Sequence, residues 1–221
     1  NQDYSFGHSV VKAARKMLNE KRPDIEIVGD DLHPIAKVKD FMPYVAKIKA
    51  SGADTVVTGN WGSDIALLVK AIKDSGLKVD IYSYYVGIMG GPSSVGAAGI
   101  GRVKQVTGFH NNIGGEADDL VEKYKKLYPE SKDDYYWISM KHALELLVQA
   151  INKSNSLDVI SIAKNLESGR YLGPTGEVWM RQDNHQLLQP IYVSSLRKQG
   201  DEGVKNDVER TGMGFKTEVR I

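Results

Sequence analysis

Residues 54–76, DTVVTGNWGSDIALLVKAIKDSG, predict a strand, a tight loop and a helix in direct succession. Residues 55–58 are all β-branched, which is typical of a buried strand. The glycines of the next four residues break this strand, and Ser63 can cap the helix that follows. Apolar residues then recur at helical spacing and form one amphipathic stripe: Ile65, Leu68, Val69 and Ile72. Gly76 stands where a glycine commonly ends a helix.

The loop at residues 59–62 is the place where such a unit would bind a ligand, because ligands of open α/β sheets bind at the carboxyl ends of strands. Trp61 lies in this loop between small neighbours, so we expect its indole ring to be accessible. The alternative is that Trp61 covers the end of the sheet, which is the more frequent role of a large aromatic side chain.

Strands and helices alternate on both sides of this unit. Helices are predicted at residues 8–21, 40–52 and 93–98, and strands at 25–28, 81–84 and 103–109. This alternation predicts an α/β fold, a doubly wound parallel sheet with helices on both faces. Such a sheet normally begins with a central strand, whereas this sequence begins with a helix. We therefore expect the first strand of the sheet to be missing from the chain.

The pattern changes after about residue 110. Amphipathic helices are predicted at residues 116–128, 135–153 and 158–168, and strands at 177–180 and 188–196. The tail from residue 198 to 221 is polar and interrupted by glycine, and no element is predicted there.

The composition is that of an ordinary globular protein. The chain has 221 residues, of which 41% are hydrophobic and 26% charged, with a net charge of +1. This charge balance gives no indication of a nucleic-acid partner. The absence of cysteine excludes disulfides, thiolate metal sites and a cysteine nucleophile within this chain.

No motif for catalysis, a metal or a cofactor is apparent. The histidines stand at positions 8, 33, 110, 142 and 185, and none has the spacing of a metal ligand. No serine has the surroundings of a nucleophile elbow, and the glycines of residues 96–101 do not match a dinucleotide fingerprint. We therefore predict no catalytic residue, no metal site and no cofactor.

Aromatic residues near predicted strand ends are the remaining candidates for a binding site. Phe6, Trp61, Tyr84 and Tyr85 form one group, and residues 135–137 form a second group at the start of a long helix. Aromatic walls with a few polar tips suit a small-molecule pocket. The alternative is that the two groups never meet.

Three stretches carry a resemblance to a known family: QDYSFGHSV at 2–10, DFMPYVAKIKASGADTVVTGNWGSD at 40–64 and YLGPTGEVWMRQDNHQLLQPIYV at 171–193. The chain resembles the periplasmic substrate-binding proteins of branched-chain amino acid ABC importers, which have the type I periplasmic-binding fold. The resemblance implies two α/β lobes that trap a ligand between them. Residues 1–108 and 187–221 would form the carboxyl-terminal lobe without its first strand, and residues 109–186 would cross to the amino-terminal lobe. The chain would then be the carboxyl-terminal part of a longer protein and would need its amino-terminal part as a partner.

The resemblance also implies a function. The complete protein would capture a small metabolite outside the cytoplasm and deliver it to the membrane permease of an ABC importer. It would be periplasmic, or extracellular and lipid-anchored in a Gram-positive source, and its signal would be removed or truncated. The alternative is a ligand-sensing regulatory domain of the same fold, whereas an enzyme is disfavoured.

Site residues can be transferred where the motifs match. Phe6, Trp61 and Tyr136 correspond to aromatic residues that pack on the ligand in the family, with Tyr135 as the alternative register for Tyr136. The family's amino-acid binders hold the ligand ammonium with a glutamate, and Tyr85 occupies that position here. This departure favours a ligand without a free ammonium, because a buried ammonium needs a charged partner. Asp64, or an acid of the missing lobe, is the alternative partner for an ammonium.

Overall fold

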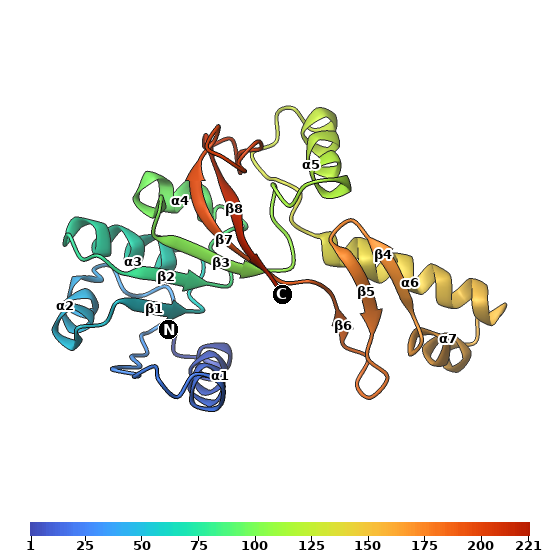
Figure 1. Ribbon diagram of the computed structural model, residues 1–221, viewed down its shortest axis with the longest axis horizontal. Helices are drawn as coiled ribbons and strands as arrows, with labels where there is room; N and C mark the ends of the chain where they lie inside the picture. The colour runs from blue at the N-terminus through green and yellow to red at the C-terminus, as the bar shows by residue number, and fades with distance from the viewer.

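The computed structural model describes residues 1–221, which form two bodies joined by extended segments (Figure 1). The first, hereafter the sheet body, contains a five-stranded sheet in the order β1-β2-β3-β7-β8. Its strands are β1 (Thr55–Thr58), β2 (Asp80–Ser83), β3 (Val103–Thr107), β7 (Tyr192–Lys198) and β8 (Met213–Arg220). The first three strands are parallel, and β7 and β8 are antiparallel to their neighbours. The α/β class is confirmed, with a sheet that is parallel in its first part and mixed as a whole.

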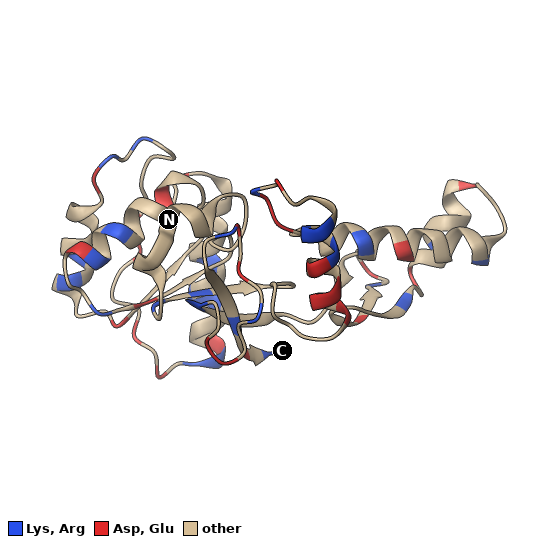
Figure 2. Ribbon diagram, turned by 90° about the horizontal axis from the view of Figure 1, so that it is seen from above, with Lys and Arg blue, Asp and Glu red and all other residues tan.

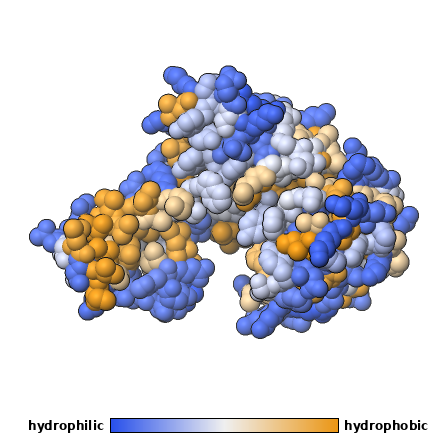
Figure 3. Space-filling view, turned by 180° about the vertical axis from the view of Figure 1, so that it is seen from behind, coloured by the Kyte–Doolittle hydropathy of each residue, from blue (hydrophilic) through white to orange (hydrophobic).

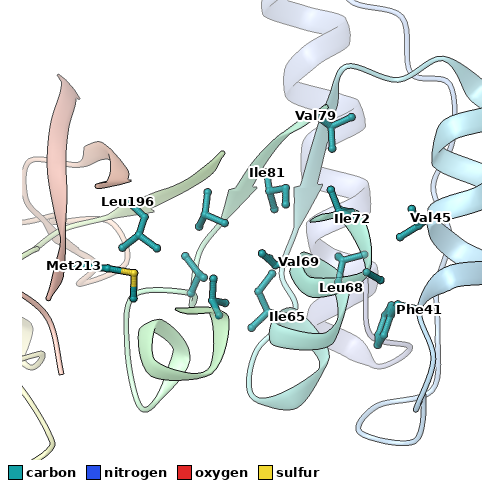
Figure 4. Packing of buried hydrophobic residues seen from close by; sticks show 14 of the residues in the cluster. Phe41, Val45, Ile65, Leu68, Val69, Ile72, Val79, Ile81, Leu196 and Met213 are labelled. Carbon is teal, nitrogen blue, oxygen red and sulfur yellow. The ribbon is translucent and has the colours of Figure 1, made fainter. Parts of the chain in front are cut away.

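The helices of the sheet body are α1 (Ser5–Lys21), α2 (Met42–Ser51), α3 (Ser63–Asp74) and α4 (Gly91–Val95), and a 3-10 turn follows at Gly96–Gly99. The stripe predicted on α3 is buried between the sheet and α2, and Ile65, Val69 and Ile72 have no exposed surface (Figure 4). These residues belong to one cluster of 16 buried apolar side chains, which also includes Phe41 and Val45 beside α3. The core therefore fixes the loop that joins β1 to α3.

The second body contains α6 (Ile138–Ser154), α7 (Val159–Leu166) and a three-stranded antiparallel sheet of β4 (Arg170–Gly173), β5 (Gly176–Met180) and β6 (Leu187–Leu188). Helix α5 (Glu116–Leu127) lies between the two bodies (Figure 1). Its first turn is acidic and its last turn basic, which suits the helix dipole, and Figure 2 shows both signs along it. No helix of the chain is long and apolar enough to span a membrane.

Helix ends mostly follow the expected signals. Gly52 and Gly76 adopt left-handed φ angles of 73° and 70° after α2 and α3, as predicted. Asp40 Oδ1 accepts a 2.8 Å hydrogen bond from the amide of Met42 at the start of α2. The predicted capping by Ser63 is wrong, because Ser63 is already the first helical residue and no side chain caps α3.

Residues 25–28 do not form the strand that their alternation predicts. Ile25 and Val28 are 39% and 42% exposed, and no strand lies beside them. Alternation alone does not make a strand when no neighbouring backbone accepts and donates its hydrogen bonds.

The carboxyl-terminal third departs most from the sequence prediction. The predicted strand 188–196 is divided around Pro190 into β6 and β7, which lie in different sheets. Strand β8 lies within the tail for which no element was predicted, and β4 was not predicted either. The long helix begins at Ile138 rather than at residue 135, so Tyr135 and Tyr136 precede it.

Candidate functional site

Four rings gather on one surface of the sheet body, which we call the aromatic surface: Tyr4, Phe6, Trp61 and Tyr85. The ring centroids of Phe6 and Tyr85 are 5.4 Å apart, and those of Tyr4 and Phe6 are 6.2 Å apart. Trp61 Nε1 donates a 2.9 Å hydrogen bond to the hydroxyl of Tyr4. Three of the predicted residues, Phe6, Trp61 and Tyr85, thus come together from the start of α1 and from the loops after β1 and β2.

The aromatic surface remains accessible. Trp61 is 45% exposed and Tyr85 37% exposed, in the loops that follow β1 and β2. Strand β1, which was predicted to be buried, lies at the edge of the sheet, and Thr58 is its one buried residue. Tyr84, also predicted, is 39% exposed but stacks on none of the four rings. Its partial burial raises the pKa of the Tyr84 hydroxyl, which therefore stays protonated at neutral pH.

Gly59 allows α1 to approach the loop after β1. A Cβ atom at this position would lie 2.8 Å from the ring of Phe6 and 2.9 Å from the side chain of Val10. Only glycine leaves room for this contact, so the sequence G-N-W-G brings Phe6 close to Trp61 as well as breaking the strand.

Asp64 lies beneath the Trp61 loop rather than on the aromatic surface. It is fully buried, and its Oδ2 accepts hydrogen bonds from Gln2 Nε2 at 2.7 Å and from the amide of Ala36 at 2.9 Å. Gln2 Nε2 also contacts the carbonyl oxygen of Trp61 at 3.3 Å. Asp64 therefore supports the loop that carries Trp61 and does not join the exposed rings.

His33 and Asn60 extend this support. Both are buried, and His33 Nε2 lies 2.9 Å from Asn60 Nδ2. Since the amide nitrogen of Asn60 is the donor, Nε2 of the imidazole must be the acceptor. Nδ1 then carries the proton and can donate to the carbonyl oxygen of Pro34, 3.3 Å away.

Tyr136 occupies a different place from the four rings. Its hydroxyl donates a 2.6 Å hydrogen bond to Glu209 Oε1, and its ring packs against the core of the sheet body. Burial, followed by the bond to Glu209, raises the pKa of Tyr136 above its ordinary value. Tyr135, the alternative register, stacks edge-on against Phe109 at 5.6 Å.

Two residues of this region were missed from the sequence. Tyr4 lies two positions before Phe6, and the Y-x-F-G spacing was available as a signal for it. Glu209 gave no signal, because it lies in the polar tail and its partners lie more than 70 residues away along the chain.

Two open pockets lie away from the aromatic surface. One of about 540 Å³ lies on the second body around β5, and one of about 620 Å³ lies between the two bodies beside β8. Neither is lined by any of the predicted site residues. No group of three or more histidine or carboxylate side chains is arranged to hold a metal ion.

Comparison of the sequence with known proteins gives a match at the level of a family. A family model described as periplasmic binding protein matches residues 1–201. "Leu/Ile/Val-binding protein homolog 4" of Brucella melitensis is 33% identical over 222 residues, which is 98% of this chain and 52% of that protein. The chain therefore spans about half the length of the curated relatives it matches.

Comparison with solved structures also finds binding proteins with a similar fold. The closed conformation of the leucine-, isoleucine-, valine-, threonine- and alanine-binding protein from Brucella ovis matches with a TM-score of 0.89 and 30% identity. The match covers 100% of this chain and 56% of that protein. A solute-binding protein from Rhodopseudomonas palustris BisB5, solved with 3,4-dihydroxybenzoic acid, matches all of this chain and 58% of its own, with a TM-score of 0.78. Its identity is 16%, so this likeness concerns the fold alone.

Proposed function

The chain belongs to the periplasmic binding protein family, and from this membership we propose that the complete protein is a non-enzymatic, extracytoplasmic solute-binding protein of an ABC importer. It captures a small metabolite, which is amino acid-like, a carboxylate or an amide, between two lobes. It then delivers this ligand to the membrane permease. The protein is periplasmic, or lipid-anchored outside the cell in a Gram-positive source.

The observation that carries this proposal is the convergence of Phe6, Trp61 and Tyr85 from three separate segments into one exposed aromatic surface. Exposed rings on rigid strand ends offer a large apolar contact area, and their polar tips can orient a ligand. We assign Phe6, Trp61, Tyr84 and Tyr85 to the ligand-facing wall. Tyr136, which lies apart from these rings, is proposed as a further ligand contact on the basis of the family resemblance.

The sheet body corresponds in this proposal to the carboxyl-terminal lobe, which was expected at residues 1–108 and 187–221, although residues 187–188 pair as β6 with β5 of the second body. Residues 109–186 cross to the amino-terminal lobe, whose remainder lies in the other half of the complete protein. The relatives' lengths agree with this assignment, since the chain covers 52% of the Brucella melitensis relative.

The chemistry of Tyr85 favours a ligand without a free ammonium. A tyrosine hydroxyl can accept one hydrogen bond from an ammonium, but it supplies no carboxylate to balance the charge. Asp64, the alternative partner, is fully buried beneath the loop. The names of the relatives with 30–33% identity favour the competing ligand class, amino acids.

Mass spectrometry and calorimetry on the complete protein test the function. We expect the purified protein to carry or bind one small metabolite per molecule and to release it chemically unchanged. L-leucine, 4-methyl-2-oxopentanoate and 4-hydroxybenzoate are suitable first probes, because they cover the amino acid, keto acid and aromatic acid classes. Chemical conversion of a bound probe would contradict the proposal.

A further inference from the structure

The loop between β7 and β8, residues 199–212, contacts the sheet body, α5 and the segment between α5 and α6, and is called the strap here. Asp207 accepts a 2.7 Å hydrogen bond from Lys125 Nζ of α5, and Arg210 Nε donates to the carbonyl oxygen of Ser131 at 2.8 Å. The strap therefore holds the segment that leads from α5 to α6.

Glu209 is the buried charged anchor of the strap on the sheet body. The residue is only 7% exposed, and its carboxylate accepts four hydrogen bonds. The donors are the amide of Gly90 at 2.6 Å, the amide and hydroxyl of Ser93 at 2.9 and 2.6 Å, and the hydroxyl of Tyr136 at 2.6 Å. All four donors are uncharged, so the buried carboxylate depends on keeping every one of them.

The backbone at this point is strained. Glu209 and Arg210 both adopt left-handed φ angles, 53° and 55°, which residues with a Cβ atom rarely adopt. The amide of Glu209 donates a 2.5 Å hydrogen bond to Asp134 Oδ2. Such a conformation persists where its surroundings fix it, and here the side chain and the backbone of Glu209 are both fixed.

The other side of this contact is the segment just before α6. Asp134 is 5% exposed and Tyr136 packs against the core of the sheet body, whereas Trp137, the next residue, is 55% exposed. The segment of residues 134–136 is thus fastened to the sheet body, and Ile138, the first residue of α6, is buried against Phe109 and α5.

We propose that the hydrogen bond between Glu209 and Tyr136 is a latch that restrains rotation of the second body against the sheet body by fixing the segment that leads into α6. Glu209 is thereby a positioning residue, since it acts through Tyr136. The inference rests on the proposed function, because this rotation is the lobe closure that would trap a ligand.

The test measures the distance between the two bodies in the complete, ligand-free protein. Spin labels are placed through Lys73→Cys on α3 and Lys164→Cys on α7; residues 1–221 contain no cysteine, and any cysteine in the rest of the complete protein is first replaced by serine. Pulsed electron spin resonance then compares the labelled parent with Tyr136→Phe, Glu209→Gln and the double variant. Glu202→Gln is the matched control, because Glu202 is on the same strap and its side chain is 95% exposed.

We expect a broader distance distribution in both single variants, because Tyr136→Phe removes the donor and Glu209→Gln leaves one acceptor oxygen for four donors. The double variant should be no broader than Tyr136→Phe, which already lacks the bond. Amide hydrogen exchange at Ser93 should also rise about tenfold in Glu209→Gln, the scale of one lost hydrogen bond to a charged group. Tyr136→Phe removes only the hydroxyl group that donates this bond. It therefore tests the latch even if Glu209→Gln fails to fold.

A lower melting temperature with an unchanged distance distribution in Tyr136→Phe would overturn the latch and leave a merely structural contact. Equal broadening in Glu202→Gln would also overturn it. Because no ligand is present, a failure here is distinguishable from a failure of the proposed binding function, which calorimetry with the three probes tests separately.

Discussion

Trp61 is the residue whose loss should weaken ligand binding without unfolding the protein. Its ring is 45% exposed and its side chain makes one hydrogen bond, to Tyr4, so little of the core depends on it. We expect Trp61→Ala in the complete protein to weaken binding by about 1–3 kcal/mol, the scale of one buried aromatic contact. Calorimetry with whichever probe binds measures this loss.

Tyr128→Ala is a suitable control, because Tyr128 is 55% exposed at the end of α5, outside the aromatic surface. Should Trp61→Ala unfold the protein while the affinity of the folded fraction stays the same, Trp61 only covers the end of the sheet.

Tyr85 should decide between two ligands that differ only in one group. L-leucine carries an ammonium where 4-methyl-2-oxopentanoate carries a keto oxygen. Of these two groups, only the keto oxygen can accept a hydrogen bond from the tyrosine hydroxyl. We expect the keto acid to bind more tightly, and Tyr85→Phe to weaken its binding by about 1 kcal/mol, the net value of one hydrogen bond. Tight leucine binding that survives Tyr85→Phe but is lost in Asp64→Asn would show that Asp64 holds the ammonium.

The sequence indicated which residues end a strand but not which side chains share a surface. Phe6, Trp61 and Tyr85 were predictable, because each follows directly from a strand end or a matching motif. The burial of Asp64 was not, because it depends on Gln2 and on Ala36, which are far from it along the chain.

At the scale of elements, the contact between α1 and the loop after β1 depends on Gly59. We expect Gly59→Ala to destabilise the complete protein by about 1–3 kcal/mol, because the new methyl group would overlap Phe6 and Val10. Urea unfolding measures the change. Gly29→Ala is the matched control, since no heavy atom lies within 4 Å of its Cβ position and it should have little effect.

His110 couples the crossover after β3 to β8 and should make stability depend on pH. Its Nδ1 accepts the amide proton of Asn112 at 3.2 Å, so Nε2 carries the ring proton and donates to Thr217 Oγ1 at 2.8 Å. Burial lowers the pKa of His110 from 6.5 to about 4. The unfolded chain therefore binds the extra proton first, and stability present above pH 6.5 is lost as the pH falls towards 4.

Between pH 7.5 and 5 we expect this group to remove on the order of 2 kcal/mol from the free energy of unfolding. His110→Gln should have a flatter dependence than the parent in urea unfolding at the two pH values. His185→Gln serves as the control, because His185 pairs with Glu167 on the surface. An unchanged slope in His110→Gln would show that the histidine does not titrate on unfolding.

The elements that were predicted correctly carry their own signals. Helix α3 has a complete apolar stripe and a glycine stop, so local sequence is sufficient to define it. Strand β8 lies in a mostly polar tail, where its alternating apolar residues, Met213, Phe215 and Val219, were not recognised as a strand. Strand β7 pairs with it along its length, whereas residues 25–28 alternate without such a partner. Local sequence does not show which distant segments will pair as strands. The secondary structure of the carboxyl-terminal third was therefore predicted least well.

At the scale of the whole molecule, the second body exposes a large apolar face (Figure 3). The residues of this face, each more than half exposed, lie on and around α6 and α7: Met140, Leu144, Val148, Leu157, Val159, Ile160 and Leu172. A hydrophobic face left in water forfeits about 25 cal/mol for each Å² that could be buried. A patch of this kind promotes association with other surfaces.

We therefore expect residues 1–221, produced alone, to self-associate and to lack a cooperative monomeric thermal transition. The double variant Leu144→Lys with Leu157→Lys should be more monomeric in analytical ultracentrifugation. Val28→Lys is the control, because it replaces an exposed apolar residue away from the face. A monomeric parent with a sharp transition would contradict the expectation.

The order of the sheet has a consequence for synthesis on the ribosome. Strands β7 and β8 are made last, yet Leu196, Met213 and Phe215 complete the same core as Phe41 and Ile65. More than 80 residues, including the whole second body, separate β3 from β7. Contacts this distant along the chain form slowly, and the nascent sheet must keep its apolar edge exposed until they do. During translation, the core beside α2 and α3 therefore stays incomplete until β7 and β8 have been synthesised. In this interval the exposed apolar surface can bind chaperones or aggregate.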